Sequence, residues 1–121
     1  MPKLDVTLGI DIGGTNTAFG FVDKQGRCII ESSIPTKSFE PAEKLFDRLS
    51  KQINELYNKI KEEYNFIGIG IGAPNANYYK GTIEYPPNLS WDYVNVVEIM
   101  QQYVDIPTAG TNDAKAAAIG E

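Results

Sequence analysis

The sequence predicts one mixed α/β domain whose sheet opens with a three-stranded antiparallel meander. Apolar and β-branched residues fill three short runs, at 6–12, 18–22 and 27–34, and turn residues bound each run. From 45 to 60 the apolar residues instead recur every three or four positions, which is typical of an amphipathic helix. Strands and helices alternate through the rest of the chain, and 121 residues without an internal repeat suit one domain.

Two turn signals and a proline mark the ends of the first three strands. Residues 13–16 (Gly-Gly-Thr-Asn) separate the first strand from the second, and residues 23–26 (Asp-Lys-Gln-Gly) separate the second from the third. Pro35 ends the third strand. Because such short connections join neighbouring strands, we expect a meander.

The helix expected next has one apolar side and one charged side. Its apolar stripe needs a sheet face to cover, so packing determines its stability. The i, i+4 pairs Asp47–Lys51 and Glu55–Lys59 would each add only about 0.3 kcal/mol. The stripe consists of Leu45, Leu49, Ile53, Leu56 and Ile60.

Residues 66–72 alternate isoleucine with glycine at a period of two. A strand here would place branched side chains on one face and bare backbone on the other, and we expect a neighbour to press closely against the glycines. The connection that follows, as far as residue 88, is long enough to contain a small hairpin. We place its arms at 78–79 and 82–83, around Lys80-Gly81.

The last third of the chain predicts a helix, a strand and the beginning of another helix. Asn95, with Glu98 three residues later, is typical of a helix start with reciprocal capping, and the apolar spacing continues the helix to Val104. A short strand follows at 107–111, and an alanine-rich helix begins at residue 112. Because the chain ends about two turns into that helix, we expect it to be part of a longer protein.

Charge and residue types exclude several classes of function. A net charge of −5 offers no positive field for a nucleic-acid backbone, so we expect no nucleic-acid partner. Without histidine the chain cannot form a Ser-His-Asp triad or a histidine-bound zinc site. Cys28 is alone, which excludes an internal disulfide and favours the cytoplasm. No segment resembles a signal peptide or a membrane span.

The sharpest candidate site is Asp-Ile-Gly-Gly-Thr-Asn at residues 11–16. Gly13 and Gly14 would let backbone N–H groups turn toward an anion, Thr15 would donate one more hydrogen bond, and Asp11 would hold a hydrated Mg²⁺. The same residues also suit a tight hairpin in which Asp11 only stabilises the turn, and the local pattern leaves both interpretations open. The segment lacks the Lys-Ser/Thr of a Walker loop and the third glycine of a dinucleotide-binding fingerprint.

Further candidates follow the later strands. Asn112 and Asp113 lie at a strand–helix junction, where open α/β sheets bind ligands, although the position of Asp113 alone favours a helix cap. Asn75 and Asn88, in the long connection, would hydrogen-bond sugar hydroxyls. Trp91 would pack on a ring face or, as its size favours, anchor the loop.

Taken together, four segments resemble the amino-terminal half of ROK-family sugar kinases, bacterial glucokinases in particular. They are residues 11–15 (DIGGT), 70–74 (GIGAP), 87–91 (PNLSW) and 112–117 (NDAKAA), so the resemblance covers essentially the whole chain. It implies the actin-like, ribonuclease H-like ATPase fold with helices on both faces of a mixed sheet. It also implies that residues 1–121 are one of two lobes, with ATP and a hexose bound between them.

The resemblance implies a reaction and a role for each candidate residue. The reaction is ATP- and Mg²⁺-dependent phosphorylation of a hexose, with glucose as the first candidate, at the 6-hydroxyl. Asp113 would be the catalytic base that accepts the hydroxyl proton. The residues that would bind nucleotide phosphate and Mg²⁺ are Asp11, Gly13, Gly14, Thr15 and Asn16, and those that would bind sugar are Asn75, Asn88, Asn112 and Asp113.

Three positions depart from the family pattern. Asn75 stands where glycine is usual, Thr111 where glutamate is usual, and Lys115 where asparagine or glutamine is usual. The zinc-binding motif and the remaining sugar contacts of the family would lie beyond Glu121, in the carboxy-terminal lobe. We therefore expect no metal ligands for zinc in this chain, no activity from this chain alone, and a homodimer for the whole protein.

Two alternatives remain on the same scaffold. One is a ROK-type transcriptional regulator that responds to sugar, and the other is a catalytically silent sugar-binding domain. Asp11 comes too early in the chain to leave room for the winged helix of such a regulator. A silent domain would not need both Asp113 and the glycine loop. We therefore expect an enzyme.

Overall fold

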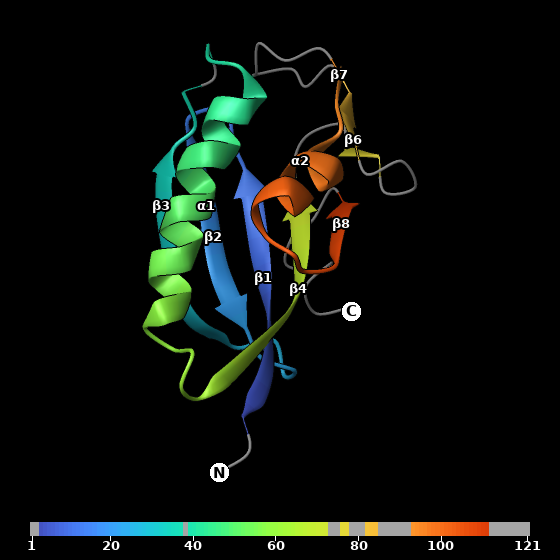
Figure 1. Cartoon of the computed structure of the whole chain (residues 1–121). Helices are drawn as coiled ribbons and strands as arrows, with labels where there is room; N and C mark the ends of the chain where they lie inside the picture. The colour runs from blue at the N-terminus through green and yellow to red at the C-terminus, as the bar shows by residue number, and fades with distance from the viewer. Residues whose placement is uncertain (1–2, 38, 73–75, 78–81, 85–92, 112–121) are drawn as a thin grey trace.

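The computed structural model describes residues 3–37, 39–72, 76–77, 82–84 and 93–111 (Figure 1). These residues form a five-stranded mixed sheet in the order β3-β2-β1-β4-β8, a small antiparallel sheet in the order β5-β6-β7, and helices α1 and α2. The elements are β1 (Leu4–Ile12), β2 (Asn16–Val22), β3 (Cys28–Pro35), α1 (Ala42–Asn58), β4 (Tyr64–Gly72), β5 (Ala76–Asn77), β6 (Thr82–Glu84), β7 (Tyr93–Val94), α2 (Val96–Tyr103) and β8 (Thr108–Thr111).

The predicted meander is confirmed. Strand β1 pairs antiparallel with β2, from Thr7 opposite Val22 to Ile12 opposite Thr17, and β2 pairs antiparallel with β3. On its other edge β1 pairs in parallel with β4, which pairs in parallel with β8. Strands β1, β4 and β8 therefore all end at the same edge of the sheet.

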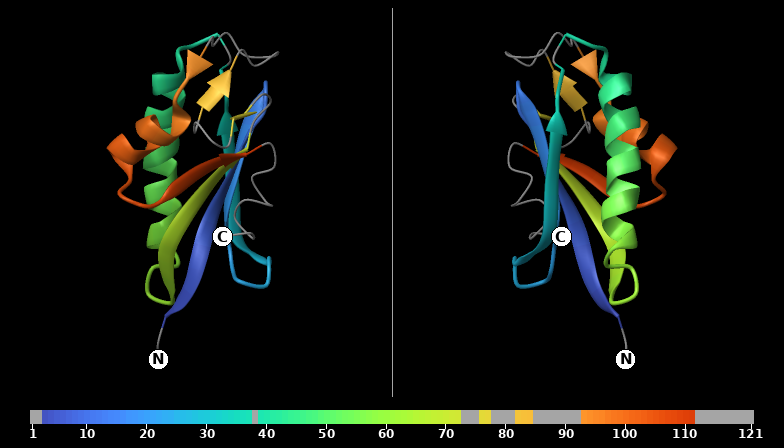
Figure 2. Two further views of the ribbon diagram at one scale, coloured as in Figure 1. Left: turned by 90° about the vertical axis from the view of Figure 1, so that its right-hand side faces the viewer. Right: turned by 90° about the vertical axis from the view of Figure 1, so that its left-hand side faces the viewer.

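Both described helices lie on one face of the sheet (Figure 2). Every second side chain of β1 and β2 points toward these helices, because successive residues of a strand point to opposite faces of the sheet. Neither described helix has the length and apolarity to cross a membrane. The helix expected from residue 112 lies outside the described residues. The core on the helix side includes Leu8, Ile10, Phe21, Leu45, Phe46, Leu49, Ile53, Ile69, Ile71, Val96 and Met100.

Helix α1 begins and ends a few residues earlier than the predicted apolar stripe, which runs from Leu45 to Ile60. It ends at Asn58, so Ile60 lies in the turn that follows, although it still packs against the core. Of the two expected charge pairs, Asp47 and Lys51 approach to 3.4 Å on the helix surface, whereas Lys59 lies at the helix end. The main stripe is buried as the spacing predicted.

Three aromatic rings close the core near the end of α1. The ring of Phe21 lies edge-on to that of Phe66, with centroids 4.9 Å apart, and Tyr57 of α1 contacts both. The Tyr57 hydroxyl donates a hydrogen bond of 2.9 Å to the carbonyl oxygen of Tyr64. This cluster ties α1 to β2 and β4.

The alternation predicted for β4 is interrupted by one extra residue. Val6 of β1 lies opposite Phe66 and Thr7 lies opposite Gly68, so Ile67 forms a bulge and is 47% exposed. Beyond the bulge the prediction holds, because Ile69 and Ile71 are buried. A neighbour also presses against a glycine as expected, since a Cβ on Gly68 would lie 3.3 Å from Cγ2 of Thr7.

The small sheet differs in detail from the expected hairpin. Its first arm is Ala76–Asn77, which pairs with β6, and Tyr93–Val94 adds a third strand that the sequence pattern did not predict. Residues 78–81 lie outside the described residues. Asn95 caps α2 as predicted, because its side chain accepts a 3.0 Å hydrogen bond from the Glu98 N–H, which is one half of the expected reciprocal cap.

Phe46 provides a test of the packing between α1 and the sheet. Its side chain is fully buried, so Phe46→Ala should lower the free energy of unfolding by about 3–5 kcal/mol. Phe39 is 78% exposed and serves as the matched control, since Phe39→Ala should change the free energy of unfolding by no more than about 0.5 kcal/mol. Urea unfolding measures both, and equal losses would contradict the described packing.

Candidate functional site

The loop between β1 and β2 is built around Gly13. The Gly13 N–H donates a 3.0 Å hydrogen bond to the carbonyl oxygen of Asn16, which draws the two strand ends together. A Cβ on Gly13 would lie 2.8 Å from that same oxygen, so no other residue fits without a shift of the backbone. Glycine is needed here for a close approach of backbone to backbone.

The outer side of this loop is suited to an anion. Thr15 and Asn16 are exposed, and Gly13 and Gly14 are half-buried. Within the described part of the chain, the N–H groups of Gly14 and Thr15 have no hydrogen-bond partner. Adjacent N–H groups and a hydroxyl at one bend form the kind of concavity that binds phosphate. The loop is thus both a hairpin connection and a set of donors, so the two interpretations left open by the pattern are compatible.

Asp11 projects from the face of the sheet that α1 and α2 leave uncovered. It alternates with Ile10 and Ile12, which are buried on the helix side. Its exposed side chain lines a shallow cavity of about 250 Å³ together with Gly9 and Gly20. An exposed carboxylate beside a phosphate loop fits a Mg²⁺ ion that keeps most of its water ligands. The described residues contain no cluster of three or more metal-ligating side chains.

The register of the sheet brings the other candidate segments close to Asp11. Asp11 lies opposite Gly72 at the end of β4, and Gly72 lies opposite Thr111 at the end of β8. With strands about 4.8 Å apart, the backbones of Asp11 and Thr111 are about 10 Å apart. Strands β4 and β8 therefore end beside the end of β1, where the loop begins. Asn75, Asn88, Asn112, Asp113 and Lys115 themselves lie outside the described residues.

Two threonines behind the loop were not singled out by the sequence pattern. The Thr36 hydroxyl donates a 2.7 Å hydrogen bond to the Gly13 carbonyl and lies 2.8 Å from the Thr17 hydroxyl. Both residues are buried. Both lie just outside the strands expected at 18–22 and 27–34, so the sequence pattern gave no signal that would have found them.

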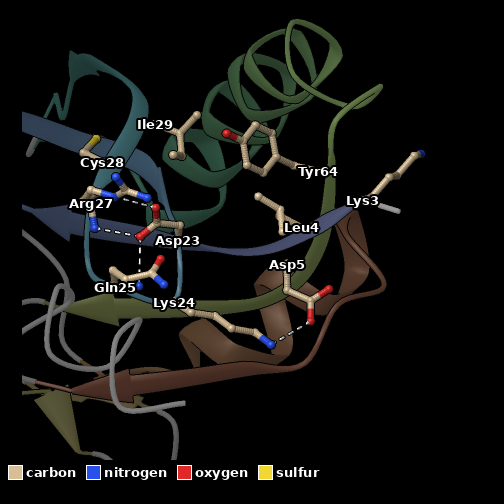
Figure 3. Close-up of a pocket in the computed structure, with 10 residues that line it drawn as sticks. All are labelled: Lys3, Leu4, Asp5, Asp23, Lys24, Gln25, Arg27, Cys28, Ile29 and Tyr64. Carbon is tan, nitrogen blue, oxygen red and sulfur yellow. Dashed lines mark hydrogen bonds and ion pairs between the residues drawn. The ribbon is translucent and has the colours of Figure 1, made fainter. Parts of the chain in front are cut away.

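A separate cavity of about 590 Å³ lies at the opposite end of the sheet (Figure 3). Its charged groups other than Lys3 bind one another in pairs. Lys24 Nζ lies 3.7 Å from Asp5, and Arg27 Nε lies 3.0 Å from Asp23. Asp23 also accepts the N–H groups of Gln25 and Arg27, at 2.9 and 3.0 Å. These contacts stabilise the β2–β3 turn, so this cavity is not a candidate binding or catalytic site.

Comparison with known proteins identifies the family, because residues 7–121 match the ROK family. The chain belongs to the ROK family. The glucokinase of Streptomyces coelicolor is 30% identical to it over 119 residues, which are 98% of this chain and 36% of that protein. The xylose repressor of Caldicellulosiruptor bescii is 33% identical over 119 residues, 94% of this chain and 29% of that protein.

A solved ROK glucokinase has the same fold as this chain. The enzyme from Streptomyces griseus, in complex with glucose and AMPPNP, is 28% identical, with a TM-score of 0.70 over 96% of this chain and 37% of that one. This ROK chain therefore has the actin-like ATPase fold of the family's sugar kinases. It spans about a third of the length of the curated relatives it matches.

Gly13 provides a test of the loop geometry in the ROK chain. Gly13→Ala places a methyl group against the backbone oxygen of Asn16 and should lower the free energy of unfolding by about 1–3 kcal/mol. Gly68→Ala is the matched control, because its methyl group meets a side-chain atom of Thr7 at 3.3 Å instead of a backbone atom at 2.8 Å. Urea unfolding compares the two, and a larger loss for Gly68→Ala would contradict the geometry.

Asp23 provides a test by pH. The hydrogen bond from the Arg27 N–H, with further help from the Arg27 side chain and the Gln25 N–H, holds the pKa of the Asp23 carboxyl below its ordinary value. A lowered pKa in the folded state stabilises the fold above about pH 4, and that contribution is lost as the pH falls further. Asp23→Asn should therefore lose less stability than wild type on acidification from about pH 5 to about pH 3. Urea unfolding at each pH would contradict this if both proteins lost stability equally.

Proposed function

We propose that the whole protein transfers the γ-phosphoryl group of ATP to the 6-hydroxyl of a hexose, with glucose as the first substrate to test. Residues 1–121 would be its amino-terminal lobe. The observation that carries the proposal is the row formed by Asp11, Gly72 and Thr111, which sets the end of β8 near the glycine loop. In the sequence, Asn112 and Asp113 follow Thr111 directly. Membership of a family that includes glucokinases supports it.

The glycine loop would bind the phosphates of ATP. Its Gly14 and Thr15 N–H groups and the Thr15 hydroxyl are donors on an exposed bend, where they would stabilise charge on the transferring group. Asp11, at the end of β1, would hold a Mg²⁺ ion through its water ligands, and that ion would neutralise phosphate charge. The complex of the Streptomyces griseus glucokinase with AMPPNP supports a nucleotide as the ligand of this fold.

Asp113 would accept the proton of the sugar hydroxyl. In the reaction, the bond between the sugar oxygen and the γ-phosphorus forms, and the bond from the γ-phosphorus to the β–γ bridging oxygen breaks, which releases ADP. The proton passes to the carboxylate as the hydroxyl attacks. The sequence predicts a helix from residue 112, and the start of a helix favours the ionised form of a carboxylate, which would be ready to accept that proton. Asn75, Asn88 and Asn112 would orient the sugar through its hydroxyls.

A second candidate function is that of a sugar-responsive transcriptional regulator. The 33% identity of this chain to a xylose repressor is the observation that favours it. The two functions make different use of ATP. A coupled assay of the whole protein across glucose, mannose, fructose and N-acetylated hexosamines separates them, since a regulator would bind a sugar without consuming ATP.

The catalytic role is tested by Asp113→Asn in the whole protein. Removal of the proton acceptor should lower kcat by about 10²–10⁴-fold, while the KM for the hexose changes much less. Asp105→Asn, at an exposed position between α2 and β8, is the matched control and should retain wild-type turnover. Steady-state kinetics on the most active hexose measures both. Near-wild-type turnover by Asp113→Asn would show that another group accepts the proton.

A further inference from the structure

A buried pair of hydroxyl groups lies directly behind the glycine loop. Thr17 and Thr36 are 0% and 1% exposed, and their Oγ1 atoms are 2.8 Å apart. A hydroxyl can donate only one hydrogen bond, and the Thr36 hydroxyl donates its bond to the Gly13 carbonyl oxygen at 2.7 Å. The Thr17 hydroxyl must therefore be the donor in the bond between the two threonines. The chain of hydrogen bonds runs in one direction, from Thr17 through Thr36 to the loop.

Thr36 holds the loop at two carbonyl groups. In addition to the hydroxyl bond to Gly13, its backbone N–H donates a 2.9 Å hydrogen bond to the carbonyl oxygen of Thr15. The two bonds reach both ends of the short bend from Gly13 to Thr15. One residue of the β3–α1 connection thus determines how two successive parts of the loop are turned.

Because the peptide group is planar, the hydrogen bonds from Thr36 also determine where the N–H groups of the loop point. In a trans peptide the C=O of one residue and the N–H of the next point in opposite directions. When Thr36 draws the Gly13 carbonyl inward, the Gly14 N–H must point outward, away from Thr36. The same relation turns the Asn16 N–H away from Thr36, because the Thr15 carbonyl is held inward.

Thr36 is in turn fixed from helix α1. The Arg48 guanidinium donates hydrogen bonds to the carbonyl oxygens of Pro35, at 2.6 Å, and Thr36, at 3.0 Å. It also lies 3.5 Å from the Glu40 carboxylate. Arg48 belongs to α1, whose apolar side is packed on the sheet, so the position of Thr36 is set by the core.

We infer that Thr36, supported by Thr17 and Arg48, is a positioning residue that holds the Gly13–Asn16 loop with its N–H groups turned toward the ATP phosphates. This inference rests on the proposed kinase function. It goes beyond that function because Thr36 lies behind the loop, on the side away from the proposed phosphate site. Its hydroxyl would act on ATP through the orientation of the Gly13–Gly14 peptide.

Kinetics of the whole protein test the inference through three variants. Thr36→Val keeps the shape of the side chain but removes the hydroxyl, and it should raise the KM for ATP at least fivefold while the KM for the hexose stays within twofold of wild type. Thr36→Ser restores the hydroxyl and should return the KM for ATP to within twofold. Thr108→Val is the matched control, because it removes a hydroxyl that bonds the Ile106 carbonyl at the start of β8, and it should leave both constants unchanged.

A second measurement does not depend on activity. Hydrogen–deuterium exchange of the peptide that covers residues 12–17 should be at least fivefold faster in Thr36→Val than in wild type or Thr36→Ser. If wild type phosphorylates no hexose, the proposed function fails, and exchange alone decides whether Thr36 orders the loop. If wild type is active but Thr36→Val matches it in exchange or in the KM for ATP, the positioning role is overturned and the kinase function stands.

Arg48→Gln keeps the inference testable if Thr36→Val does not fold. Arg48 is partly exposed, so its replacement leaves the core intact. The loss of its bonds to the Pro35 and Thr36 carbonyls should raise the KM for ATP at least twofold without a change in the KM for the hexose. An unchanged KM for ATP, or an equal rise in both constants, would overturn the positioning role.

Discussion

The arrangement of the whole chain depends on the two different edges of β1. On one edge it pairs antiparallel with β2, so the chain must reverse sharply at Gly13. On the other edge it pairs in parallel with β4, whose next neighbour β8 is also parallel. The carboxyl end of β1 therefore leads into a tight loop and lies level with the carboxyl ends of β4 and β8. That juxtaposition brings the Asp11 loop beside the ends of β4 and β8.

The packing of the helices supports the loop from a distance. Helix α1 buries Leu45, Phe46 and Leu49 against the sheet, and the same helix carries Arg48 on its flank. Through Arg48 and the buried Thr36, the apolar core is connected to the backbone of the glycine loop by hydrogen bonds of 2.7 to 3.0 Å. A loop that must offer its N–H groups to an anion loses less free energy on binding when those groups are already turned outward.

The sequence pattern predicted most elements because periodicity reports which faces are buried. The apolar run at 6–12 and the helical spacing from Leu45 to Leu56 both correspond to buried residues in the structure. The pattern was wrong at Ile67, where a bulge opposite Val6–Thr7 turns an isoleucine outward. It also missed β7, because a two-residue strand has no period of its own and forms only beside β6.

The sequence by itself determined the local chemistry of the candidate site: a glycine bend with a carboxylate before it and a hydroxyl after it, and a family resemblance that the comparisons confirm. Only the tertiary structure decided that Gly72 and Thr111 lie in register with Asp11, and that the Gly13 carbonyl accepts a hydrogen bond from the hydroxyl of Thr36, 23 residues away. The physical reason is that strand order and buried hydrogen bonds between distant residues depend on how elements pack together. A linear pattern records which residues are buried and does not record which residues they meet.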